Sequence, residues 1–304
     1  MKRKIYVIID ESGGKGYFDN PEAYKNEVGV LIGYVINENE YSLVFDKLTR
    51  IADKFKKAHQ KTHLMSMTER EKKRLCAKYN RVFRLYKTNC FFEAIYVQGY
   101  HEFNLNQQEI ARRSTSTLHE LGILVNNHEQ RPLLYSELFN AVVLKTILFY
   151  YCKYYTTDLH FEIIVDNIDK GTLKKLQDNL KNDINLIINR KQPVKLCSYK
   201  KELKKTTVDA ECIFNTGITY PENMRFENIS YNISSTDNSL TLGADIISYN
   251  LRKYLEKKSK KGPMENLNTK KAIKGFPMKY LFVNTLLSEN NFGDKIYRHP
   301  KCTQ

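Results

Sequence analysis

The sequence predicts an α/β protein in which strands alternate with helices and two strands end at aspartates. Residues 5–10 and 28–36 are apolar runs of strand length, joined by a segment that contains several glycines. Residues 159–165 alternate between apolar and polar side chains, as a half-buried strand does. Between these strands apolar residues recur at helical spacing. This order favours one large core with an inserted segment.

The first half of the chain adds two helices and a strand to this pattern. Residues 39–58 carry apolar side chains on one helical face and lysines near the end, where cations complement the helix dipole. Thr68 and Glu71 have capping-box spacing, which predicts a helix from residue 68 to about residue 87. Residues 90–97 have the length and composition of a strand.

The second half adds four helices and one strand, followed by a basic segment. Pro132 begins the most apolar helix, since proline is favoured at the first helical position. The predicted elements are a polar helix at 106–125, the apolar helix at 132–155, a lysine-rich helix at 171–188, a strand at 194–199 and a closing helix at 240–255. The stretch 225–235 has no assignable pattern. We expect a core at 1–256, including a helical insertion at about 100–157, and a basic loop and C-terminal tail at 257–304.

The composition predicts a globular protein with a positive field. Hydrophobic residues make up 41% of the 304 positions, with 13 glycines and 7 prolines, so most of the chain should pack into a core. The net charge of +15 attracts polyanions, and nucleic acid is the commonest large polyanion in a cell. A lysine-rich solvated surface explains the same charge, so charge alone leaves the partner open.

The cysteines and apolar runs indicate a soluble, cytoplasmic protein. The six cysteines form no CxxC pair, which predicts neither a zinc site nor a disulfide framework. The apolar run before Asp10 is too short for a signal peptide. Lys145 interrupts the longest apolar run, so we expect a buried helix there and no membrane span.

Three aspartates are the candidates for the chemistry. Asp10 ends the first strand and is followed by Glu11 and a glycine turn, which places its carboxylate at the rim of the sheet, where ligands bind in open α/β folds. Asp166 repeats this arrangement after the strand at 159–165. If the two strands are parallel neighbours, their carboxylates lie side by side and a cation relieves the repulsion. Asp245 lies in an apolar helix, where an acid is costly to bury unless paired or metal-bound.

Each aspartate also has a purely structural interpretation. An aspartate before glycines often forms a turn with its own backbone, as Asp10 could. Asp245 taken alone fits an exposed helix position. Two carboxylates at the ends of two apolar strands are less easily explained by chance.

These residues carry a resemblance to a known family. Asp-Glu-Ser-Gly-Gly from Asp10, Asp166 after a later strand, and Leu-Thr-Leu-Gly-Ala-Asp ending at Asp245 resemble the family catalogued as domain of unknown function 3800 (DUF3800), whose typical last motif reads LQLAD. The match covers roughly residues 3–255. The resemblance implies a ribonuclease H-like fold with a mixed five-strand sheet flanked by helices. It also implies metal-dependent nuclease activity, often in phage or mobile-element defence, with the three aspartates as metal-binding residues.

The sequence departs from that family after the first helix. The family usually has a Glu-Leu-His or Glu-Ile-Lys element there, whereas Thr62 stands before His63 in this chain and replaces the expected acid. Glu11, Glu69 or Glu137 could supply a fourth ligand, although each also fits a surface or capping charge. His63 is a candidate phosphate contact or proton shuttle, although a lone histidine is more often structural.

The implied cofactor is Mg²⁺ or Mn²⁺. A site built from carboxylates supplies hard oxygen ligands and no thiolate, which suits these ions better than Zn²⁺. Two ions about 4 Å apart, bridged by Asp10, would activate a water and stabilise the leaving oxygen of a phosphodiester. Lysines that follow the acidic positions could hold phosphates, although such runs are more often only solvated; they are Lys170, Lys174, Lys175, Lys257, Lys258, Lys260 and Lys261.

The main hypothesis is therefore a metal-dependent nuclease that hydrolyses DNA or RNA. An alternative is a catalytically inactive nucleic-acid-binding or scaffolding subunit of a larger complex, in which Thr62 reflects lost chemistry. A phosphatase or nucleotide hydrolase that uses the same ions is a third class, which the basic surface does not favour. A homodimer through the helix at 132–155, or a partner protein from a defence system, is compatible with the sequence.

Overall fold

The computed structural model describes part of the chain: residues 2–13, 27–59, 64–102, 105, 109, 134–154, 158–188, 194–200, 205–212, 229–262, 264 and 267–283. The polar helix predicted at 106–125 lies outside the described residues apart from position 109. Among the described helices, none has the length and apolar character needed to cross a membrane.

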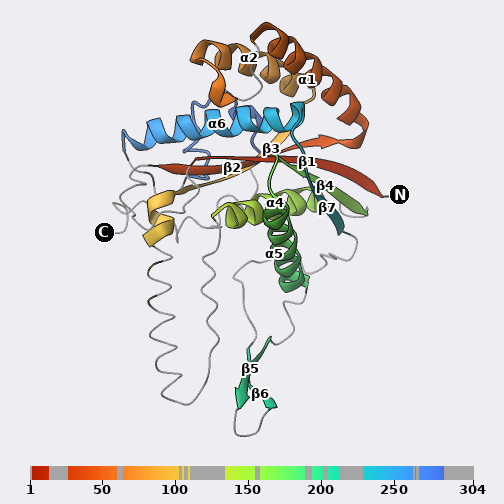
Figure 1. Cartoon of the computed structure of the whole chain (residues 1–304), viewed down its shortest axis with the longest axis vertical. Coiled ribbons are helices and arrows are strands. Elements are labelled where there is room, and N and C mark those ends of the chain that lie inside the picture. The colour runs from red at the N-terminus through yellow and green to blue at the C-terminus, as the bar shows by residue number, and fades with distance from the viewer. Residues whose placement is uncertain are drawn as a thin grey trace.

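A mixed sheet of five strands in the order β3-β2-β1-β4-β7 lies at the centre of the molecule (Figure 1). Its strands are β1 (Arg3–Ser12), β2 (Val28–Asn37), β3 (Asn89–Tyr96), β4 (Leu159–Val165) and β7 (Ile229–Ser235). β2 is antiparallel to β1 and β3, whereas β1, β4 and β7 are parallel. This is the topology of ribonuclease H-like proteins, so the predicted fold class is confirmed.

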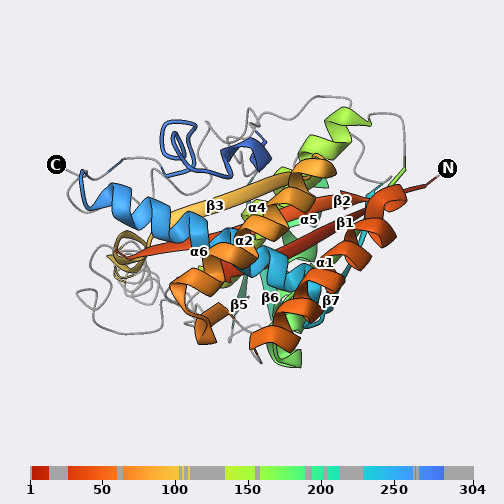
Figure 2. The ribbon, with the colours of Figure 1, turned by 90° about the horizontal axis from the view of Figure 1, so that it is seen from above.

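Helices cover both faces of this sheet. They are α1 (Glu38–His59), α2 (Glu69–Leu85), α4 (Leu134–Lys153), α5 (Lys170–Ile188) and α6 (Ser239–Ser259), with short 3-10 helices η2 (Leu64–Ser66) and η4 (Lys279–Leu281). α6 lies across one face with α1 and α2 beyond it, and α4 and α5 cover the other face (Figures 1 and 2). A separate hairpin consists of β5 (Val194–Lys200) and β6 (Lys205–Cys212).

Successive side chains of β1 pack into two different hydrophobic cores, one on each face of the sheet. Ile8 packs in the core beneath α1, α2 and α6, whereas Val7 and Ile9 pack in the core beneath α4 and α5. Successive side chains of a strand point to opposite faces. Asp10, two residues after Ile8, therefore lies on the face that α6 covers.

Two buried tyrosines, Tyr34 of β2 and Tyr79 of α2, bond to the first turn of α6 and hold it between the sheet and α2. The hydroxyl of Tyr34 donates to the carbonyl of Leu240 at 2.9 Å, and that of Tyr79 donates to the carbonyl of Ser239 at 3.2 Å. A Cβ at Gly243 would lie 3.2 Å from the Tyr34 hydroxyl oxygen, which is tighter than ordinary packing. The glycine in the Leu-Thr-Leu-Gly-Ala-Asp motif therefore permits close approach of the helix.

Two strands of the structure have no counterpart among the predicted ones. β7 falls in the stretch that the sequence left unassigned, and its side chains are mostly half-buried, so no clean apolar alternation marks it. β6 follows β5 in the hairpin. Residue 256, the predicted end of the core, lies inside α6, and residues 267–283 add buried side chains to the core; these are Leu267, Ala272, Ile273, Phe276, Met278, Leu281 and Phe282.

Candidate metal centre

The register of the parallel pair β1 and β4 brings the first two candidate aspartates to the same level. Ile9 and Val165 form the last pair of that register, and Asp10 and Asp166 are the next residues. Ile164, two residues before Asp166, packs on the α6 side of the sheet like Ile8. The two aspartates thus follow neighbouring strands at the carboxyl-terminal edge, as the sequence predicted for parallel neighbours.

Ser235 at the end of β7 fixes the turn that carries Asp166. Its hydroxyl donates to the carbonyl of Asp166 at 2.9 Å and accepts from the amide of Ile168 at 3.0 Å. The amide of Thr236 also donates to the carbonyl of Val165 at 3.0 Å. These bonds satisfy backbone groups that the strand leaves unpaired at its end.

α6 adds the third aspartate from above the sheet. The Ser248 hydroxyl lies 3.4 Å from Oδ2 of Asp10, 3.5 Å from the carbonyl oxygen of Glu11 and 3.1 Å from that of Asp245. Ser248, which is three residues after Asp245 in α6, therefore contacts the end of β1. Residues three apart on a helix lie on the same side of it.

The electrostatics of Asp10 show that the acids act on one another. The Asp10 carboxyl is buried, with 6% of the residue exposed. Burial raises its pKa well above the usual value, and the charges of Glu11, Asp245 and Asp166 raise it further, while a hydrogen bond from the backbone of Glu11 acts in the opposite direction. Four acids from three distant segments of the chain therefore repel one another at one place.

The described residues supply this carboxyl with no counter-charge. Within the described part of the chain, no ion pair includes Asp10, whose hydrogen-bond partners are Ser248 and the Glu11 backbone. In the same part of the chain, no three His, Cys, Asp or Glu side chains stand in an arrangement ready to hold a metal ion. The acids are close enough to influence the pKa of Asp10 but are not preassembled as ligands.

Sequence reasoning missed two residues of this region, Ser248 and Tyr135. Tyr135 comes from the first turn of α4, and its pKa is raised well above the usual value by burial and then by Glu11, Asp10 and Asp166. Its hydroxyl side chain therefore lies within the field of the acids, on the opposite face of the sheet from α6. The spacing of Ser248 from Asp245 was a signal available in the sequence, whereas Tyr135 offered none.

The other candidate ligands lie away from Asp10 or outside the described residues. Thr62 and His63, and the side chain of Glu137, lie outside the described residues. The Glu69 side chain is 72% exposed and accepts from Lys72 and from the Tyr249 hydroxyl, so it belongs to the surface between α2 and α6.

Of the seven candidate lysines that follow Asp166 and Asp245, one donates hydrogen bonds to the backbone and the other six are exposed. Lys258 donates to the carbonyls of Lys271 and Ala272, so it holds the C-terminal segment against α6. The exposed ones are Lys170, Lys174, Lys175, Lys257, Lys260 and Lys261.

Gly13 follows directly after the strand that carries Asp10 and cannot be replaced without strain. Its φ is +118°, and a Cβ would lie 2.5 Å from the carbonyl oxygen of Val28. We expect Gly13→Ala to lower the free energy of unfolding by about 1–3 kcal/mol, because both the conformation and the space exclude a side chain. Gly262→Ala, whose Cβ would have no neighbour within 4 Å, is the matched control. Urea denaturation that finds equal stabilities for the two variants would contradict this account.

Comparison with protein-family models and with curated proteins finds no match to this chain. Fold and site together define a ribonuclease H-like α/β protein with acids gathered at the carboxyl-terminal edge of β1 and β4. The resemblance to DUF3800 proteins therefore stays a prediction from the motifs at Asp10, Asp166 and Asp245.

Proposed function

We propose that this protein is a metal-dependent nuclease that hydrolyses phosphodiester bonds of DNA or RNA. The observation that supports it most is the Asp10 carboxyl, which is buried among other acids without a described counter-charge. Such an arrangement is unfavourable unless a cation or a proton compensates it. The fold and the DUF3800-like motifs are compatible with this proposal, and a role in phage or mobile-element defence belongs to it.

The donor set fits Mg²⁺ or Mn²⁺. Asp10, Asp166 and Asp245 would hold the ions through carboxylate oxygens, with Glu11 as a further candidate, and hard cations prefer such ligands. Bound ions of this kind activate water and stabilise the charge that develops on a leaving oxygen. The proposal requires the aspartate side chains to turn toward a common point, since the described acids are not preassembled.

The test is cleavage of single- and double-stranded DNA and RNA by the full chain, with Mg²⁺ or Mn²⁺ and with a chelator. We expect Asp10→Asn and Asp245→Asn to lower the cleavage rate by about a hundredfold or more, because each removes a carboxylate that would hold the metal ions, and the ions would stabilise the charge at the reacting phosphate. Asp46→Asn, at an exposed position of α1, makes the same chemical change away from these acids and should leave the rate unchanged.

Two outcomes would overturn the proposal. Cleavage that survives Asp10→Asn would show that another site acts. Nucleic-acid binding without cleavage under any of these metal conditions would instead favour the alternative, a catalytically inactive binding or scaffolding subunit of a larger complex.

A further inference from the structure

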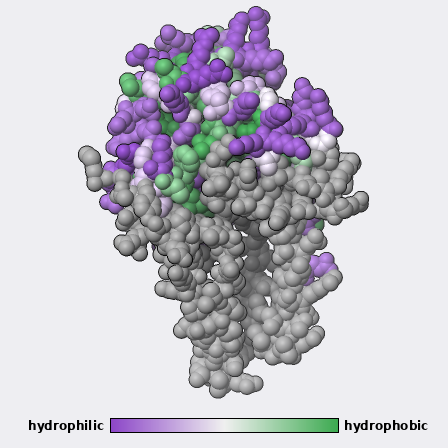
Figure 3. All heavy atoms as spheres, turned by 180° about the vertical axis from the view of Figure 1, so that it is seen from behind, coloured by the Kyte–Doolittle hydropathy of each residue, from purple (hydrophilic) through white to green (hydrophobic). Residues whose placement is uncertain are grey.

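α2 has a strongly one-sided charge. It carries seven Lys or Arg residues and two Glu residues, whereas α1 beside it carries five Lys or Arg residues and four acids. Hydrophilic side chains dominate the described surface at the end of the molecule where these helices lie (Figure 3). α2 is therefore a stronger candidate than α1 for a contact with a polyanion.

Both glutamates of α2 bond to groups other than its exposed Lys and Arg side chains, so they do not neutralise those cations. Glu69 accepts from the ammonium of Lys72 and from the hydroxyl of Tyr249, each at 3.2 Å. Glu71 accepts from the amide of Thr68 in the capping box and pairs with His59 at 3.2 Å. The helix thus uses its negative charges for its own start and for contact with its neighbours.

The exposed cations of α2 form a stripe along one side of the helix. Its members are Arg70, Lys73, Arg74, Lys78 and Arg81, and none of them forms an ion pair with another described residue. Spacings of three and four residues repeat along a helix side, so the stripe extends over roughly 16 Å. This length is sufficient to contact successive phosphates of one strand.

The first turns of α2, which carry the start of the stripe on their exposed side, pack with their other side against the part of α6 that carries Asp245. Lys72 donates to the Tyr249 hydroxyl at 3.2 Å, and its ammonium lies 4.6 Å from the centre of that ring. Asn250 also contacts Cys76 of α2 at 3.7 Å. Tyr249 is one helical turn after Asp245, and the start of α2 lies over the middle of α6 in Figure 2.

We infer that this α2 stripe binds the phosphate backbone of the nucleic acid that the proposed site cuts. The inference rests on the proposed function. Backbone contacts of this kind position a strand without reading its sequence, because they reach phosphates and not base edges. The charge complementarity and the adjacency to Asp245 both favour nucleic acid as the occupant.

The test compares two triple charge reversals of equal composition. One is Arg70→Glu with Lys73→Glu and Lys78→Glu on α2, and the control is Arg50→Glu with Lys54→Glu and Lys57→Glu at exposed positions of α1. Fluorescence anisotropy with a labelled single-stranded DNA, in a chelator to prevent cleavage, gives affinity as a function of salt. Circular dichroism verifies that both variants fold.

We expect the α2 variant to bind DNA about tenfold or more weakly. The slope of log affinity against log salt concentration should be shallower by about 2, because each lost phosphate contact on a single strand removes about 0.7 from that slope. The α1 control should change much less, and equal weakening of both would overturn the inference. Calorimetric titration with Mn²⁺ separates the two proposals. Mn²⁺ binding that persists in the α2 variant supports a separate stripe, whereas a wild type that binds DNA through α2 but binds no Mn²⁺ overturns only the metal site.

Discussion

Replacing Asp10 by asparagine is expected to raise the free energy of unfolding at neutral pH, although it removes the central residue of the proposed metal centre. The wild-type carboxylate is buried, is repelled by Glu11, Asp245 and Asp166, and has a raised pKa. An amide of the same shape carries no charge and can keep the contact with Ser248. The gain should be on the order of 1–3 kcal/mol, the range for a change that removes an uncompensated buried polar group.

The sign of the pH dependence follows from the direction of the shift. Because the pKa of Asp10 is higher in the folded protein than its usual value of 3.8, folding favours the protonated form. The stability contributed by that proton is complete below pH 3.8 or so and is lost as the pH rises through the folded pKa. The advantage of Asp10→Asn over wild type should therefore grow with pH in chelated buffer, as measured by urea denaturation. If Asp10→Asn and wild type were equally stable at neutral pH, the assignment of a raised pKa to Asp10 would be wrong.

Metal addition should reverse this order. Mn²⁺ at about a hundred times its dissociation constant would stabilise the wild type by about 2.7 kcal/mol, because only the folded chain binds it. Asp10→Asn should show little of this gain, whereas Asp46→Asn, at an exposed position, should keep it. Equal stabilisation of wild type and Asp10→Asn would place the metal elsewhere.

The convergence of the acids could be predicted because strand ends are strong sequence signals. Asp10 and Asp166 each follow an apolar run, and parallel pairing of those runs was sufficient to bring them to one edge. The parallel pairing itself was a condition of that prediction, because an apolar run does not show which strand it pairs with. Asp245 was singled out because an acid is costly to bury in an apolar helix, and its motif then linked it to the other two aspartates.

What the sequence did not predict depends on contacts between distant residues. The half-buried edge strand β7 lacks a clear apolar period, and the place of Tyr135 near Glu11 depends on how α4 packs against the sheet. The partner of Lys145 also could not be predicted from the sequence. Lys145 interrupts an apolar run and so indicated a buried helix, but its partner Glu93 lies 52 residues earlier in the chain. Local periodicity contains no signal for such pairs.

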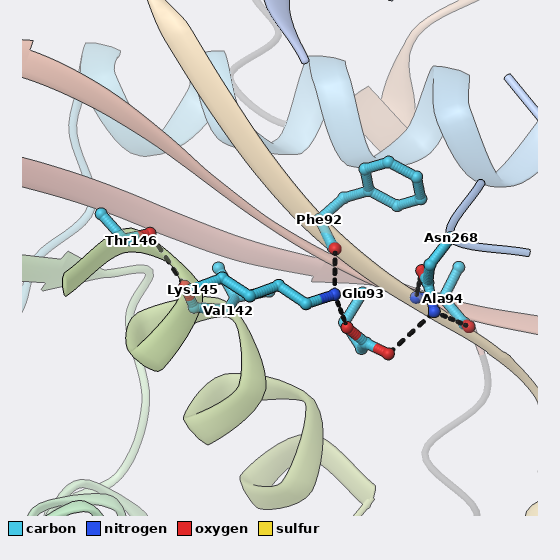
Figure 4. Close-up of polar contacts among 7 residues, drawn as sticks. All are labelled: Phe92, Glu93, Ala94, Val142, Lys145, Thr146 and Asn268. Atoms are coloured by element: carbon cyan, nitrogen blue, oxygen red, sulfur yellow. Dashed lines mark hydrogen bonds and ion pairs between the residues drawn. The ribbon is translucent and has the colours of Figure 1, made fainter. Parts of the chain in front are cut away.

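Glu93 of β3 and Lys145 of α4 form a buried ion pair, and Asn268 also forms a hydrogen bond with Glu93 (Figure 4). Lys145 donates to the Glu93 carboxylate and, at 3.4 Å, to the carbonyl of Phe92. Asn268 donates to Oε1 of Glu93 at 2.8 Å and forms hydrogen bonds with both backbone groups of Ala94, at 2.8 and 3.2 Å. Burial raises the pKa of Glu93, while Lys145 and Asn268 act against that rise. The group joins α4 and residue 268 to the edge strand.

Lys145→Met is therefore expected to lower the free energy of unfolding by about 3–5 kcal/mol, because it leaves the Glu93 carboxylate buried without its cation. Lys153→Met, at an exposed position of the same helix, makes the same side-chain change and should cost much less. A double variant with Glu93→Leu and Lys145→Met removes both charges and should recover part of the loss, since well-packed apolar groups often replace a buried pair without penalty. Urea denaturation of the three variants tests this. A double variant less stable than Lys145→Met alone would indicate that the carboxylate is held mainly by Asn268, and the ion-pair explanation would then be wrong.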